Sequence, residues 1–149
     1  MPSTVDFPSA AKRHWHDASS LEASGRTGNA GQLYGFSAEC GIKALLVALG
    51  YPTDPDGSPA MNPPAGIPKV RKHIHHLVGI IANIQSDIAG RSGAKYSAMF
   101  PNITNFANWS TDHRDWTDAA IPNSLPAWKA AANEVMKMLE EASLDGVLK

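Results

Sequence analysis

The stretch that decides the fold is residues 29–50, NAGQLYGFSAECGIKALLVALG. Only Glu39 and Lys43 are charged in it, and they stand four positions apart with the acid first, the favourable order for a helical pair. The other residues are mostly small, so that neighbouring helices can approach closely, or bulky and apolar. We predict a buried helix over residues 30–49, with Asn29 as its N-cap, Gly50 as its stop and Glu39–Lys43 as a buried pair.

Three further segments have helical spacing. Apolar residues recur every three or four positions over residues 9–23, and again from about Ser124, where Pro126 suits a first helical turn. Between them lies a heptad seam that predicts a helix over residues 70–88, ended by Gly90. Its apolar positions are Val70, Ile74, Leu77, Ile81, Ile84 and Ile88. Residues 51–68 hold six prolines and predict a long surface loop, and residues 91–123 are expected to be irregular.

Strand signals are essentially lacking, so the sequence predicts an all-α fold: one up-down four-helix bundle over residues 1–149 with long Pro/Gly-rich loops. The chain has 149 residues, 43% hydrophobic and 18% charged, which is typical of one globular domain. The formal net charge of −1 gives no global attraction to nucleic acid or membrane. No apolar run is long enough to span a membrane and the N-terminal segment does not resemble a signal peptide, so we expect a cytoplasmic protein without membrane association.

The most unusual polar stretch is residues 69–76, KVRKHIHH. Cations at the start of a helix oppose its dipole, so such a turn is better suited to receiving an anion than to standing alone. A solvated basic turn and a contact with phosphate or RNA both remain open. Arg71 and His76 together are a minimal set for cleaving RNA through its own 2′-hydroxyl, one to stabilise charge and one to transfer a proton. The residues predicted to touch nucleic acid are Lys69, Lys72, His73 and Arg114, with Arg71 and His76 as the catalytic candidates.

Other chemistries find less support in the sequence. His-x-His on a helix directs the two rings apart and no Cys or Glu stands at ligand spacing, so we expect no metal site. No phosphate-binding glycine loop, GxSxG, HExxH or CxxC is present, and we expect no cofactor. Cys40, the one cysteine, lies in an apolar run and is interpreted as inert. Arg114 is expected either to pair locally with Asp112 or Asp115 or to join the basic turn.

Several of these elements together resemble the HEPN superfamily, the higher eukaryotes and prokaryotes nucleotide-binding domains. The resemblance rests on Leu33-Tyr34-Gly35-Phe36 leading into Ala38-Glu39-Cys40 and Lys43-Ala44-Leu45-Leu46, on a later helix opening with His76-Leu77, and on an aromatic-arginine element from Trp109 to Trp116. It covers roughly residues 9–142, and the helix over 30–49 is its distinctive part.

This resemblance implies a helical domain that usually forms a symmetric dimer, in families widespread in prokaryotic toxin–antitoxin and antiviral systems. Many members are metal-independent ribonucleases with an Arg-x4–6-His motif near the last helix. Here that spacing is found at Arg71 and His76, in the third predicted helix, while the fourth begins SLPAWKAAANE. Two interpretations stay open: a homodimer that binds or cleaves RNA or a nucleotide, and a non-catalytic module for dimerisation or for binding a partner protein.

Overall fold

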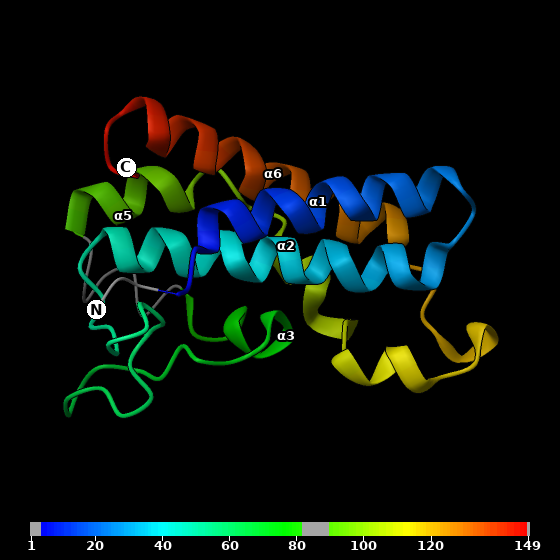
Figure 1. Cartoon of the computed structure of the whole chain (residues 1–149), viewed down its shortest axis with the longest axis horizontal. Helices are drawn as coiled ribbons and strands as arrows, with labels where there is room; N and C mark the ends of the chain where they lie inside the picture. The colour runs from blue at the N-terminus through cyan, green and yellow to red at the C-terminus, as the bar shows by residue number, and fades with distance from the viewer. Residues whose placement is uncertain (1–3, 82–89, 149) are drawn as a thin grey trace.

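The computed structural model describes residues 4–81 and 90–148. Helices α1 (Phe7–Ala23) and α2 (Thr27–Ala48) form an antiparallel hairpin (Figure 1). Asp6 caps α1 by accepting a hydrogen bond from the backbone N–H of Ser9 at 3.1 Å. The predicted helix over 30–49 is confirmed, but α2 begins three residues earlier. Asn29 is therefore not its N-cap, and Gly50, with a φ of +107°, follows the helix end as expected.

Helix α6 (Leu125–Leu144) packs along α2 and runs in the same direction (Figure 1). Glycines of α2 let large side chains come close to its backbone. A Cβ on Gly31 would lie 2.8 Å from the Trp128 ring, and one on Gly41 would lie 2.5 Å from Val135 Cγ1. The expected close packing on the small residues of α2 is confirmed, and this close packing compensates for the low helix propensity of glycine.

The predicted helix over 70–88 is wrong in its first part. Residues 70–73 are not helical and bend at Lys72, whose N–H bonds to the Val70 carbonyl at 2.8 Å. Helix α3 spans only Ile74–Leu77, and residues 78–80 form a turn that contains Gly79. The helix cannot start earlier because His73 has β backbone angles (φ −75°, ψ 161°) and the Ile74 N–H is bonded to a side chain of α2. The seam positions Val70, Ile74, Leu77 and Ile81 are nevertheless buried, whereas Ile84 and Ile88 lie outside the described residues.

Residues 90–123 contain more helix than the sequence indicates. Gly90 lies in helix α5 (Gly90–Ser97) and so is not the expected helix stop, and three 3-10 helices follow: η2 (Ile103–Asn108), η3 (Thr111–Asp115) and η4 (Asp118–Ala120). Phe106 and Trp109 are buried in the main core, as expected of aromatic residues that pack onto a bundle. In Figure 1, α3 and these 3-10 helices lie along the same side of α2.

The Pro-rich loop over residues 51–68 is tied down at both ends. Tyr51 Oη donates a hydrogen bond to the Pro68 carbonyl at 2.5 Å, and an isolated antiparallel bridge joins Thr53 to Pro59. This bridge is the only β structure in the described part of the chain, so the all-α class is confirmed. No helix among the described residues is long and apolar enough to cross a membrane.

Candidate nucleic-acid interface

A buried carboxylate joins α2 to the basic segment. Glu39 Oε1 accepts hydrogen bonds from His73 Nδ1 and from the backbone N–H of Ile74, both at 3.0 Å. Glu39 Oε2 accepts one from Lys43 Nζ at 3.1 Å, and both side chains are buried, which confirms the expected pair. We call Glu39, Lys43 and His73 the Glu39 cluster. The Glu39 cluster gives the buried Glu39 carboxylate the partners without which its burial would be costly, and the bond to the Ile74 N–H fixes the start of α3.

His73 is held on one side and open on the other. Its side chain is 50% exposed although its Nδ1 is bonded to the buried carboxylate. The Phe36 ring meets it edge-on at 6.0 Å, and the His75 ring stacks on it at 6.5 Å. A carboxylate that holds Nδ1 fixes the orientation of the imidazole and favours the tautomer with the proton on Nδ1. The second ring nitrogen, Nε2, is then a proton acceptor.

The two predicted catalytic residues occupy different local environments. Arg71 lies in the non-helical stretch before α3 and pairs with Asp54 at 3.3 Å, with both side chains more than a third exposed. His76 is exposed within α3 and its ring lies 4.0 Å from that of His75. No hydrogen bond joins Arg71 to His76 in residues 4–81 and 90–148. Their joint role in one site stays a prediction.

The predicted nucleic-acid contacts are all accessible. Lys69, Lys72 and His73 are exposed in the same segment as Arg71. Arg114 is also exposed, in η3, and its Nε lies 3.7 Å from the Asp115 carboxylate. The expected local pairing of Arg114 is confirmed, but an exposed pair at this distance contributes little and leaves the guanidinium free to exchange partners.

Two further histidines carry unpaired ring nitrogens. Nδ1 of His75 and Nδ1 of His113 are enclosed and have no hydrogen-bond partner among the described residues. Burial lowers the pKa of both side chains, and the nearby His76 and His73 lower that of His75 further. Both rings are therefore held neutral near pH 7, each with one donor and one acceptor nitrogen.

Cys40 and the histidines are not arranged for thiolate or metal chemistry. Burial, with a smaller effect of Glu39, raises the pKa of the Cys40 thiol to about 11, so the nucleophilic thiolate is scarce at neutral pH. Among residues 4–81 and 90–148, no group of three or more His, Cys, Asp or Glu side chains could hold a metal ion.

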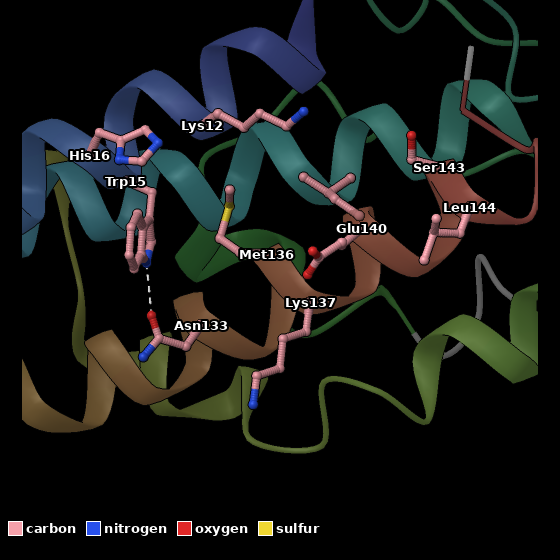
Figure 2. Close-up of a pocket in the computed structure, with 10 residues that line it drawn as sticks. Lys12, Trp15, His16, Asn133, Met136, Lys137, Glu140, Ser143 and Leu144 are labelled. Atoms are coloured by element: carbon pink, nitrogen blue, oxygen red, sulfur yellow. Dashed lines mark hydrogen bonds between the residues drawn. The ribbon is translucent and has the colours of Figure 1, made fainter.

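A separate groove of about 710 Å³ runs between α1 and α6 (Figure 2). Trp15 Nε1 crosses it to donate a hydrogen bond to Asn133 Oδ1 at 2.7 Å. Lys12 and Lys137 stand at the groove with Glu140, and Leu144, 79% exposed, lies at its C-terminal end. The groove combines apolar surface with charges of both signs, a composition common in protein interfaces.

The Glu39–His73 contact was not predicted from the sequence. The sequence pairs Glu39 with Lys43 through their helical spacing, but nothing local connects Glu39 to a residue 34 positions later. Comparison of the chain with family models, with curated proteins and with solved structures finds no match.

Proposed function

We propose that this chain is a cytoplasmic HEPN-like domain that binds RNA and cleaves it without a metal ion, as part of a prokaryotic toxin or defence system. The observation that carries the proposal is the Glu39–His73 pair. A buried carboxylate orients a half-exposed imidazole, and exposed cations flank it at Lys69, Arg71 and Lys72. The up-down four-helix arrangement belongs to the same proposal, with α1, α2 and α6 as three of its helices.

The reaction uses the 2′-hydroxyl of the RNA as nucleophile. His73 Nε2 takes the proton of the 2′-hydroxyl while its oxygen attacks the adjacent phosphorus. The bond from phosphorus to the 5′-oxygen breaks, and His76, in its protonated form, donates a proton to that oxygen. The products are a 2′,3′-cyclic phosphate and a 5′-hydroxyl. Arg71 stabilises the charge that develops on the phosphoryl oxygens, and it exchanges Asp54 for the RNA when it does so.

The basic segment explains how RNA would be retained. Contacts from cationic side chains to phosphates give most of the sequence-independent affinity, and they weaken as salt rises. Phe36 and the ring of His75 add aromatic surface beside His73, on which an unpaired base can stack. Single-stranded RNA is therefore the expected substrate, because duplex bases are not free to stack on protein rings.

The test is cleavage of total tRNA and of a mixed single-stranded RNA, with and without chelator. We expect chelator-insensitive cutting that is lost in His73→Ala and His76→Ala and reduced in Arg71→Ala. Lys129→Ala, on α6 and outside the groove between α1 and α6, is the matched control and should cut normally. If no protein cuts, the enzymatic proposal is refuted, and a salt titration of RNA binding then decides whether the non-catalytic interpretation applies.

A second candidate function, dimerisation, is favoured by the groove between α1 and α6. We propose a second copy of the chain as its occupant, because the patch is self-complementary. Lys137 and Glu140 stand three apart on α6, so a twofold contact lets each Lys137 meet the partner's Glu140. The same contact would cover the exposed Leu144. An interface for a different protein is the alternative that the test must separate.

Light scattering after gel filtration tests the dimer. We expect a dimer that Leu144→Asp converts to a monomer. Lys137→Glu and Glu140→Lys should each weaken it, and the double variant should restore it, because the charges are exchanged within one twofold contact. A monomeric wild-type protein, or a dimer that none of these variants changes, would rule this interface out.

A further inference from the structure

Three imidazole rings crowd around the four-residue helix α3. The His75 ring lies 4.0 Å from the His76 ring and stacks on the His73 ring at 6.5 Å, with only 8° between the two planes. The Trp109 ring lies 5.6 Å from that of His75. Neutral rings pack well at these distances, but each proton that acid adds to one imidazole opposes the protonation of the next.

His75 is the ring that acid disturbs most. Its Nδ1 is enclosed and has no hydrogen-bond partner among the described residues. In a neutral ring this nitrogen is a bare acceptor, whereas a protonated ring carries an N–H on both nitrogens. A buried charged donor without an acceptor costs much more than a buried neutral acceptor. Burial, followed by the neighbouring His76 and His73, accordingly lowers the pKa of the His75 side chain.

The charged groups that face His75 do not offset this cost. Glu39 of α2 acts to raise the pKa of His75, but its carboxylate is already bonded by the other members of the Glu39 cluster and by a backbone N–H. Asp112 of η3 acts in the same direction and is exposed to solvent. Helix η2, which also packs against α3, has the sequence ITNFAN without a titratable group. Neither carboxylate bonds to His75 Nδ1.

The same acidification has the opposite effect at His73. Its Nδ1 already bonds to the Glu39 carboxylate at 3.0 Å, and its side chain is half-exposed. A proton on His73 makes this contact a charge-assisted hydrogen bond, which is stronger, and the exposed side of the ring stays in water. Acid therefore strengthens the attachment of the segment at His73 and weakens it two residues later, at His75.

Helix α3 can move as a short unit. A helix of one turn has little stability apart from its packing. Two backbone hydrogen bonds hold it closed, since the N–H groups of Leu77 and Val78 donate to the carbonyls four residues earlier, each at 3.1 Å. The turn over residues 78–80 contains Gly79, where an added Cβ would meet only one backbone oxygen of the described residues, at 3.8 Å. The backbone therefore has room to rotate at this turn.

We propose that α3 is a proton-operated latch, in which protonation of His75 releases residues 75–78 from α2 and η2. The start of the segment stays attached to Glu39, while Leu77, fully buried in the closed state, becomes exposed. The latch does not depend on the RNA proposal, because it concerns the exposure of α3 and not what binds beside it. It differs from general unfolding in acid, because the opening takes up one proton and leaves α1, α2 and α6 folded.

Amide hydrogen exchange, followed by NMR from pH 7.5 to 5.0 and corrected for the intrinsic effect of pH, tests the latch. The N–H groups of Leu77 and Val78 report the opening, and that of Leu45 in α2 reports global unfolding. The ordinary histidine pKa of about 6.5 limits the gain, because one imidazole can favour the open state at pH 5 by at most about 30-fold. We expect exchange at Leu77 and Val78 to rise about 5- to 30-fold, and to be faster than at Leu45 throughout.

Substitution of His75 separates the latch from other titrations. Neither His75→Gln nor His75→Phe can take up the proton, so each should reduce the rise at Leu77 to less than about twofold. The phenylalanine variant keeps a ring beside Trp109, and it serves if the glutamine variant does not fold. His14→Gln removes another partly buried histidine whose pKa is lowered, on α1, and as the matched control it should keep the rise of the wild type.

Three outcomes would overturn the latch. The first is a wild-type protein in which exchange at Leu77 does not rise in acid, or rises only together with that at Leu45 and at the same rates. The second is a rise that persists unchanged in both His75 variants. The third is a rise that disappears in His73→Gln but not in the His75 variants, because the proton would then act at the Glu39 contact.

Discussion

Removal of the Glu39 carboxylate tests the central contact of the structure. Glu39→Ala leaves the Lys43 ammonium buried without a counter-charge and the Ile74 N–H without its acceptor. Breaking one side of a buried pair typically costs about 3–5 kcal/mol, and losing a helix cap about 1 kcal/mol. These effects overlap because the buried Lys43 can partly rehydrate in the cavity left by the truncation. We therefore expect a loss of about 3–5 kcal/mol in the free energy of unfolding.

A second substitution separates charge from packing. Lys43→Met removes the buried ammonium, so the double variant Glu39→Ala/Lys43→Met should be more stable than Glu39→Ala alone. Urea denaturation followed by far-ultraviolet circular dichroism measures the single and double variants as a thermodynamic cycle. A loss below about 1 kcal/mol in Glu39→Ala, or strictly additive effects in the cycle, would refute the importance of the pair.

Three other predictions concern packing, protonation and reactivity. Gly35→Ala would place a Cβ against the buried Trp109 indole, which is fixed by its hydrogen bond to the Gly31 carbonyl at 3.0 Å. Urea denaturation should show a loss of about 1–3 kcal/mol in the free energy of unfolding, and an unchanged midpoint would contradict the close packing. Burial lowers the pKa of His14, His75 and His113, and the unfolded chain therefore binds protons that the folded chain does not. The free energy of unfolding should therefore be highest above about pH 6.5 and fall as the pH drops below this value. Measurement of Tm from pH 7.5 to 5.5 tests this, and His75→Gln should show a smaller fall in Tm over this range than the wild type. The pKa of the Cys40 thiol is raised to about 11, so little of the reactive thiolate is present at pH 8. The thiol should therefore react with a thiol reagent on the order of 100-fold more slowly in the folded protein than in denaturant. Equal rates would show that the fold does not protect the thiol.

Features that depend on local pattern could be predicted from the sequence. The burial of α2, its closely packed glycines and the Glu39–Lys43 pair all follow from the composition and spacing of residues within one helix. The start of α6 directly after Ser124, with Pro126 in its first turn, and the stop at Gly50 follow from ordinary sequence preferences at helix ends, although the Ser124 side chain makes no cap hydrogen bond. In each case the residues that interact are close in sequence or share one apolar face.

Features that depend on distant contacts could not be predicted. A heptad seam favours one helix from Val70 onward, but Glu39, more than 30 residues earlier, takes the Ile74 N–H and holds His73 in an extended conformation. Val70, Ile74, Leu77 and Ile81 are still buried, because a non-helical residue at position 70 and a short helix after it can direct the same apolar side chains into the core.

The tied ends of the Pro-rich loop have a practical consequence. The Tyr51–Pro68 hydrogen bond joins the two ends of the loop, and the Thr53–Pro59 bridge fixes its first half. Residues 61–66 form a largely exposed tip. Lengthening such a tip raises the entropic cost of closing the loop only slowly, by about 0.6 kcal/mol for each doubling of loop length. An epitope tag or a fluorescent reporter inserted there should leave α2 and the basic segment in place, so that the protein can be followed in a cell with both free ends of the chain unmodified.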